Sequence, residues 1–249
     1  MKQSVKRVII LVLTGVLLGT AQAGAEVTLF QAEETARLIA ALLSSGRIVI
    51  DRNEELIDDQ SKGNKGFTPD VFERQLVEEF RVRTGVDLKN LSAARLPPMA
   101  GDLLRALLQV SKDVVADAQP TINQQGVGYK NFIPAIFGSQ VAGRFSAKSH
   151  VNLKQTTLQP RNPNNAPDAY EQAVLQRLMT QPSQSVTITE MPEGEKRLRL
   201  MTPIYYTKEC LKCHGSPVGE RDISGYPKEG AQEGDLAGAI SVSIPLGGQ

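Results

Sequence analysis

Both cysteines and one of the two histidines of this 249-residue chain lie within five consecutive residues, Cys210-Leu211-Lys212-Cys213-His214. The C-x-x-C-H spacing is that of covalent c-type haem attachment. In such a site two thiols add to the vinyl groups of the porphyrin, and the histidine that follows binds the iron. We therefore predict one covalent haem c, held by Cys210 and Cys213, with His214 as the proximal iron ligand.

Two other interpretations of the motif are weaker. A structural zinc site needs four ligands, and His150 is the only cysteine or histidine that remains outside the motif. A thioredoxin-like dithiol pair does not require the histidine and is expected in a βαβ context. We therefore favour haem over zinc or dithiol chemistry.

The iron ligand opposite His214 is left open by the sequence. His150 is the only other histidine, although its place near the end of a helix also suits a surface cap. Met201 lies on the predicted strand that leads to the motif, and methionine is a common ligand in c-type sites. The third alternative is an open or water-bound position, which would permit a diatomic gas to bind.

Two further residues are candidates for contact with the cofactor. Arg161 suits a haem propionate, because guanidinium binds carboxylates well, or alternatively an ion pair with Asp168 in its own loop. Tyr206 comes shortly before the motif and is placed to border the porphyrin.

The N-terminus is typical of a secretory signal peptide. Lys2, Lys6 and Arg7 precede an apolar stretch over 8–19, and small residues around 21–25 offer a cleavage site. This stretch is shorter than the roughly 20 residues of a membrane span, which makes an uncleaved anchor the weaker alternative. We predict a signal peptide over 1–25 and a periplasmic protein. With 28 basic and 27 acidic residues, the chain lacks the positive charge of a nucleic-acid-binding protein.

An internal repeat aligns residues 41–89 with 106–154 at a constant offset. Each copy predicts a helix (29–58 and 99–121), a Gly-Lys loop, a second helix starting at Pro69 or Pro134, and a short strand (86–88 and 151–153). Thr68 is the predicted N-cap of the helix at Pro69, whereas Ile133 offers no cap. We therefore divide the mature chain into a helical repeat copy over 26–98 and a haem domain over 99–249.

The rest of the chain predicts one helix and three strands. The helix covers about 167–180, and the strands cover 185–190, 197–204 and 236–246, with the haem motif between the last two. The predicted class is α+β: an N-terminal helical repeat unit followed by a small antiparallel sheet with flanking helices.

Residues 106–246 resemble a family of exported c-type haem proteins with a PAS-like domain, long catalogued as a domain of unknown function. The matching blocks cover 161–171, 210–215, 225–227 and 233–242. The resemblance implies a PAS-like sheet and roles in redox or small-ligand sensing and electron transfer. Relatives can use a cysteine as second axial ligand, but this chain has no third cysteine, and Pro134 falls near that position.

The sequence thus predicts a periplasmic monohaem protein, similar to a c-type cytochrome, for electron transfer or for sensing a redox state or small ligand. Its expected partner is a redox protein or a membrane-bound signalling protein, and nucleic acid is not expected. One alternative is a haem enzyme with peroxidase-like activity at an open sixth site, with His150 as acid–base group. Another is a binding module in which haem is structural. A non-enzymatic role is favoured.

Overall fold

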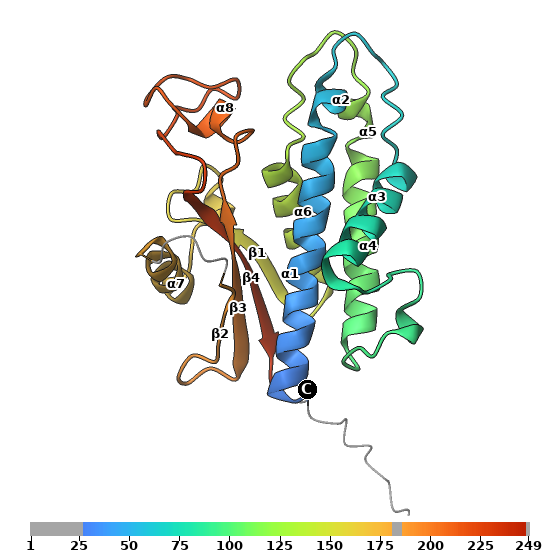
Figure 1. Cartoon of the computed structure of the whole chain (residues 1–249), viewed down its shortest axis with the longest axis vertical. Helices are drawn as coiled ribbons and strands as arrows, with labels where there is room; N and C mark the ends of the chain where they lie inside the picture. The colour runs from blue at the N-terminus through green and yellow to red at the C-terminus, as the bar shows by residue number, and fades with distance from the viewer. Residues whose placement is uncertain (1–26, 181–185, 248–249) are drawn as a thin grey trace, which may run out of the picture.

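The computed structural model describes residues 27–180 and 186–247, so the predicted signal peptide lies outside the described residues. The helices are α1 (Leu29–Arg52), α2 (Glu54–Asp58), α3 (Pro69–Thr84), α4 (Ala100–Asp117), α5 (Gln119–Ile122), α6 (Pro134–Lys148), α7 (Ala169–Thr180) and α8 (Leu211–His214). The strands are β1 (Asn152–Thr156), β2 (Ile188–Glu190), β3 (Arg197–Tyr205) and β4 (Leu236–Pro245). The predicted α+β class is confirmed (Figure 1).

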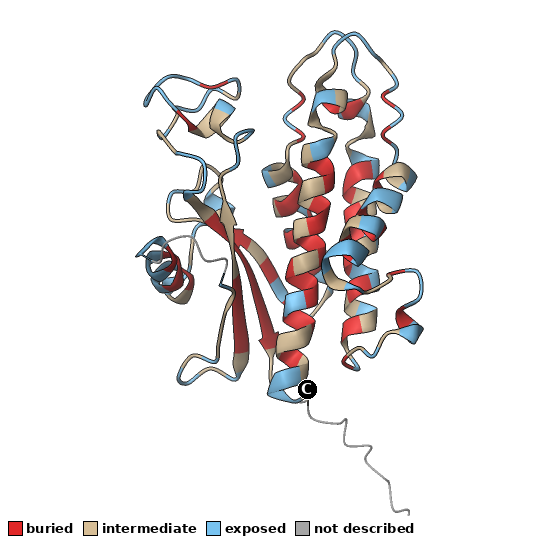
Figure 2. Ribbon diagram, in the orientation of Figure 1, coloured by how far each residue is buried: buried red, intermediate tan, exposed pale blue. Residues whose placement is uncertain are grey.

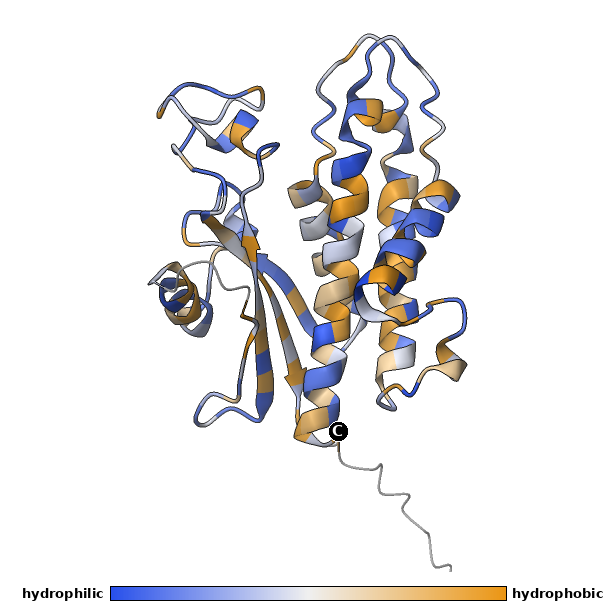
Figure 3. Cartoon of the chain, viewed as in Figure 1, coloured by the Kyte–Doolittle hydropathy of each residue, from blue (hydrophilic) through white to orange (hydrophobic). Residues whose placement is uncertain are grey.

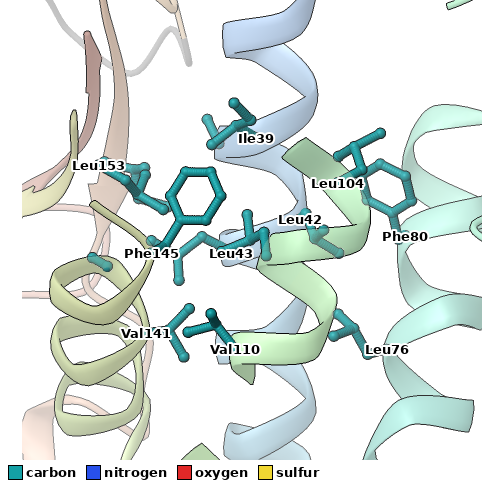
Figure 4. Close-up of a cluster of buried hydrophobic side chains, with 14 of the residues drawn as sticks. Ile39, Leu42, Leu43, Leu76, Phe80, Leu104, Val110, Val141, Phe145 and Leu153 are labelled. Atoms are coloured by element: carbon teal, nitrogen blue, oxygen red, sulfur yellow. The ribbon is translucent and has the colours of Figure 1, made fainter. Parts of the chain in front are cut away.

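Helix α1 is the centre of a bundle in which it packs against α3, α4 and α6 and also against the sheet (Figure 1). Apolar residues recur on several of its faces, and many of them are buried (Figure 2). Figure 4 shows side chains from α1, α3, α4, α6 and β1 meeting in one cluster. The same cluster includes residues of β3 and β4, such as Leu200 and Val242. One hydrophobic core therefore joins both repeat copies to the sheet, and the division of the chain at residue 98 stays a prediction.

The sheet has the strand order β1-β4-β3-β2, with antiparallel neighbours throughout. Leu198 and Leu200 of β3 join the core shared with the bundle, whereas Met201 packs with Ala239 against α7. Hydrophobic and hydrophilic residues alternate along the start of β3, as expected for a strand with two different faces (Figure 3). The sheet is therefore covered by the bundle on one face and by α7 on the other.

The two repeat copies are related by an approximate two-fold arrangement of phenylalanine rings. Phe72 and Phe137 are equivalent residues, and their ring centroids lie 5.3 Å apart. Phe67 meets Phe72 at 6.3 Å, and the equivalent pair, Phe132 and Phe137, meets at 6.4 Å. Such edge-to-face contacts stabilise aromatic pairs beyond simple burial.

The two Gly-Lys loops are held by a reciprocal exchange between the copies. The backbone N–H of Lys65 donates to Asn123 Oδ1 at 2.9 Å, and that of Lys130 donates to Asp58 Oδ1 at 2.8 Å. Asp58 and Asn123 are themselves equivalent in the repeat. Each copy therefore ends its first helical segment with the side chain that fixes the other copy's loop.

The first copy does not form the predicted strand over 86–88. That segment follows α3 and turns back on itself, with Asp87 accepting hydrogen bonds from Lys89 and Asn90. In the second copy β1 finds a partner in β4, and a strand needs such a partner to satisfy its backbone groups. The structure also divides each predicted first helix in two. The helix predicted over 29–58 is interrupted at Asn53, and the one predicted over 99–121 is interrupted at Ala118.

Two local predictions about the second helices are confirmed. Thr68 caps α3 by accepting a hydrogen bond from the Val71 N–H, while Ile133 gives α6 no side-chain cap. Gly85 ends α3 in the left-handed conformation. Within the part of the chain that the structure describes, no helix has the length and apolar character needed to cross a membrane.

The close approach of α1 and α6 depends on Gly46. A Cβ atom at this position would lie 2.8 Å from the Phe137 ring, whereas one at Gly143 would meet nothing within 4 Å. We expect Gly46→Val to lower the free energy of unfolding by about 2 kcal/mol through overpacking. Gly143→Val should change it by less than about 0.5 kcal/mol. Urea denaturation of both variants checks this, and equal effects would contradict the packing assignment.

Candidate functional site

The C-x-x-C-H motif forms a single helical turn, α8, just beyond the end of β3 (Figure 1). The backbone N–H groups of Cys213 and His214 both donate to the Cys210 carbonyl, at 3.1 and 3.0 Å. Gly215 must follow at once, because a Cβ there would lie 2.6 Å from the Leu211 carbonyl oxygen. Cys210 and Cys213 are free thiols and are partly exposed.

The loop over 215–235 folds back on the motif and fixes it by backbone hydrogen bonds. Ala231 N–H donates to the His214 carbonyl at 2.8 Å, and Gly230 N–H donates to that of Gly215 at 3.0 Å. At the base of the loop, Tyr206 exchanges two backbone hydrogen bonds of 2.9 Å with Gly234 and Asp235. The motif is therefore bracketed on both sides by the same loop.

The imidazole of His214 has two defined neighbours. Its Nδ1 lies 2.9 Å from Glu229 Oε2. The Tyr206 ring packs beside it, with centroids 5.0 Å apart and planes tilted by 38°. Because a carboxylate only accepts hydrogen bonds, Nδ1 is assigned as the protonated nitrogen, and Nε2 carries the free lone pair. The structure thus places the predicted site residues His214 and Tyr206 in contact.

Arg161 joins this cluster, but its partner is not the predicted one. The predicted alternative of an ion pair with Asp168 is wrong, because Asp168 binds Arg199 at 2.6 Å. Arg161 instead donates to Asp222 at 2.6 Å and to Glu229 at 2.7 Å, and its Nη2 reaches the Cys213 carbonyl at 2.9 Å. Its donors are engaged by protein acceptors, so Arg161 holds the motif loop together.

The charges in this cluster stabilise one another. Burial alone would raise the pKa of Asp222, but hydrogen bonds from Ser224 and Arg161 hold it far below its ordinary value. Glu229 follows the same pattern, with Arg161 and His214 lowering its pKa against the effect of burial. Burial and the nearby carboxylate of Asp222 raise the pKa of the Cys213 thiol.

Helices α1 and α2 of the bundle present a charged face to the motif. Arg47, Asp51, Glu54 and Asp58 recur at helical spacing, and each is coupled electrostatically to residues of the 209–212 segment. Burial lowers the pKa of Arg47 to about 10, and its guanidinium donates to the Pro134 carbonyl and to Gln155 Oε1. Burial raises the pKa values of the three carboxyls.

Tyr129 lies on the same side as this charged face. Burial and the neighbouring Cys213 thiol raise its pKa to about 12, and its hydroxyl bonds Asn131 at 3.0 Å.

The two predicted candidates for the ligand opposite His214 lie elsewhere. Met201 is fully buried in the cluster between the sheet and α7. His150 is exposed and precedes β1, whose first residue, Asn152, pairs with Ser243 of β4. The motif follows Tyr205, which pairs with Leu236 at the opposite end of β4. Seven residues of strand separate the two ends, which is about 23 Å, so the fold does not bring His150 to His214.

Comparison with known proteins places the chain in a family. The family model named Tll0287-like matches residues 26–245. The chain belongs to the Tll0287-like family. The match begins before the predicted limit of about residue 106, so the first repeat copy is part of what the family shares. Among curated proteins none matches.

One solved structure is similar to part of the chain. It is described as the crystal structure of the cyanobacterial heme-protein Tll0287, and it is 20% identical to this chain with a TM-score of 0.43. The likeness covers 61% of this chain and 98% of that one.

Sequence reasoning missed three residues of the site. Glu229 and Asp222 lie in a loop whose charges suggest a solvated surface, and Arg47 lies within a predicted core helix. The only signal in the sequence was Arg161 itself, because a guanidinium in a rigid loop rich in proline and asparagine needs hydrogen-bond acceptors. The roles of Glu229 and Asp222 depend on contacts with Arg161, which lies more than 60 residues earlier in the sequence.

Removal of the Arg161 guanidinium should leave the carboxylates of Asp222 and Glu229 without their shared cationic partner. The Asp222 side chain is 0% exposed and that of Arg161 20%. We expect Arg161→Gln to lower the free energy of unfolding by about 3 kcal/mol. Arg177→Gln is the matched control, because Arg177 forms a similar two-bond pair with Glu190 at the surface and should cost less than about 1 kcal/mol. Denaturant unfolding checks both, and equal losses would contradict the assigned role.

The lowered pKa of Asp222 also predicts a pH dependence. A carboxyl whose pKa is depressed on folding contributes stability above its ordinary value of 3.8, and that stability is lost as the pH falls further. Asp222→Asn should therefore flatten the decline of unfolding free energy between pH 5 and pH 2. Asp102→Asn, at an exposed carboxyl, should leave the slope unchanged. A slope that is the same in Asp222→Asn and wild type would refute this assignment.

Proposed function

We propose that this protein carries one haem c, attached covalently through Cys210 and Cys213, with His214 as the proximal iron ligand. The most direct support is that the side chains of Cys210, Cys213 and His214 are all available to bind the group. Both thiols are free and partly exposed on one helical turn, and the hydrogen bond from Nδ1 to Glu229 leaves Nε2 of His214 for a metal. The residues present therefore fit the group that the motif predicts, and the family includes a protein described as a heme-protein.

The remaining residues of the site would orient the ligand rather than react. When bound, the haem supplies reversible one-electron chemistry and a coordination position for small molecules. Tyr206 packs beside the imidazole, and Arg161 fixes the loop that encloses it. The chain's own contribution is then to hold His214 in one orientation with one tautomer.

Among haem functions, we propose sensing of a redox state or small ligand as the best supported. Electron-transfer cytochromes commonly close the sixth position with methionine or histidine, but Met201 and His150 are both directed elsewhere by this fold. Pro134, which stands near the cysteine ligand of some relatives, offers no metal-binding side chain. A sixth position without a strong protein ligand is open to a diatomic gas.

Electron transfer is the second candidate, and the surface beside the motif favours it. Val218, Ile223 and Tyr226 are exposed apolar residues in the loop that encloses the motif. Exposed apolar side chains beside a redox centre suit the docking of a redox partner. A peroxidase-like reaction has less support, because the predicted acid–base group, His150, lies at the other end of the sheet.

We also propose that the protein works in the periplasm. The basic and apolar pattern over 1–25 supports export, and c-type haem is attached outside the cytoplasmic membrane. The expected partner is a redox protein or a membrane-bound signalling protein.

The test is the spectrum of protein produced together with the c-type haem maturation machinery. We expect one covalent haem per chain, retained under denaturing conditions, and a ferrous form that binds CO. Cys210→Ser with Cys213→Ser should abolish covalent retention. His150→Ala and Met201→Leu are the controls and should leave both the spectrum and CO binding unchanged. Wild-type protein without covalent haem would refute the proposal. A low-spin form that does not bind CO would instead support electron transfer.

A further inference from the structure

We propose that Glu229 is a positioning residue that acts on the iron through His214. Its carboxylate accepts the hydrogen bond from Nδ1–H at 2.9 Å, which makes the imidazole a stronger donor and lowers the reduction potential of the site. This role rests on the proposed function, because it takes His214 as an iron ligand. Glu229 is then a residue outside the C-x-x-C-H motif that helps to set the reduction potential.

The hydrogen bond defines both nitrogens of the ring. A carboxylate offers only acceptors, so the proton of a neutral His214 must sit on Nδ1. The lone pair is then on Nε2, the nitrogen that points away from Glu229 and serves as the ligand atom. The Tyr206 hydroxyl lies 3.5 Å from the same Nδ1, at the limit of a hydrogen bond, so Glu229 is the principal acceptor.

Glu229 is itself held from two sides. Arg161 donates from Nε to Oε1 at 2.7 Å and from Nη2 to Oε2 at 3.0 Å, which fixes the plane of the carboxylate. The backbone bonds from 230–231 to 214–215 fix its distance from the ring. A fixed carboxylate is what a lasting effect on the imidazole requires, because a mobile side chain would exchange the hydrogen bond with water.

The negative charge of Glu229 is not cancelled by its partner. Arg161 is shared with Asp222, to which it donates at 2.6 Å, so two carboxylates stand against one guanidinium. One net negative charge therefore remains beside His214 within the cluster of these three side chains. A negative charge next to the proximal ligand favours the ferric over the ferrous state.

The experiment measures the reduction potential and the ferrous Fe–His stretching frequency of haem-loaded Glu229→Gln. Glutamine is similar in size and removes the charge. We expect the equilibrium constant for reduction to rise at least about tenfold, which is 59 mV for a one-electron couple. We also expect a lower Fe–His frequency, because the imidazole becomes a weaker donor. A merely structural role would change stability and leave the frequency in place.

Glu233→Gln is the matched control, because it removes the same charge from an exposed position in the same loop. Its potential shift should be much smaller, with no change in the Fe–His frequency. If Glu229→Gln accumulates too little loaded protein, Glu229→Asp is measured instead; it keeps the charge, shortens the side chain and should also lower the frequency. Equal shifts in Glu229→Gln and Glu233→Gln, or an unchanged frequency in the position-229 variant, would overturn the inference. Wild-type protein without haem would instead overturn the proposed function.

Discussion

The guanidinium of Arg161 is the contact on which the geometry of the candidate site depends. Helix α8 contains no buried residue, so apolar packing contributes little to its position. Arg161 compensates by binding the Cys213 carbonyl together with Asp222 and Glu229, which come from different parts of the enclosing loop. Arginine suits this position because its planar fork satisfies several acceptors at once and stays charged at any physiological pH. Arg161 lies in the segment between β1 and α7, so the cluster also links the motif to the connection that leads to the helix on the outer face of the sheet.

The duplicated helical unit explains the shape of the fold and also its asymmetry. The paired phenylalanines and the exchanged loop contacts show that both copies build one symmetric bundle. Only the second copy continues into the sheet, because β4 offers one free edge position and β1 fills it. The residue that ends α3 is therefore a glycine in a turn, whereas its equivalent, His150, lies between the end of α6 and the start of β1. The long α1 packs against both the bundle and the sheet, so one core joins the bundle to the inner face of the sheet, and a smaller cluster lies between the other face and α7.

Local sequence patterns predicted most of this structure, and contacts between distant segments account for what they missed. The helix start at Thr68-Pro69, the strand ahead of the motif and the closing strand all follow from residues adjacent in sequence. The alternation of Leu198 and Leu200 also implies that Met201 faces the other side, but α7 as its cover lies outside such a pattern. Glu229 and Asp222 were not predictable for the same reason. Their roles come from an arginine more than 60 residues earlier, and a charged loop is usually solvated.

The charged face opposite the motif gives a physical reason for the covalent attachment that we propose. A haem that is held without covalent bonds depends on apolar burial, which contributes about 25 cal/mol per Å². Here the bundle presents Arg47, Asp51 and Glu54 toward the motif, and the shifted pKa values of these groups show that their desolvation is already costly. Two thioether bonds would keep the proposed cofactor in place without help from this surface. The polar groups would then be available to act on the proposed cofactor through their charges. In the proposed arrangement the cysteines would retain the haem, and charged residues around the motif would control its chemistry.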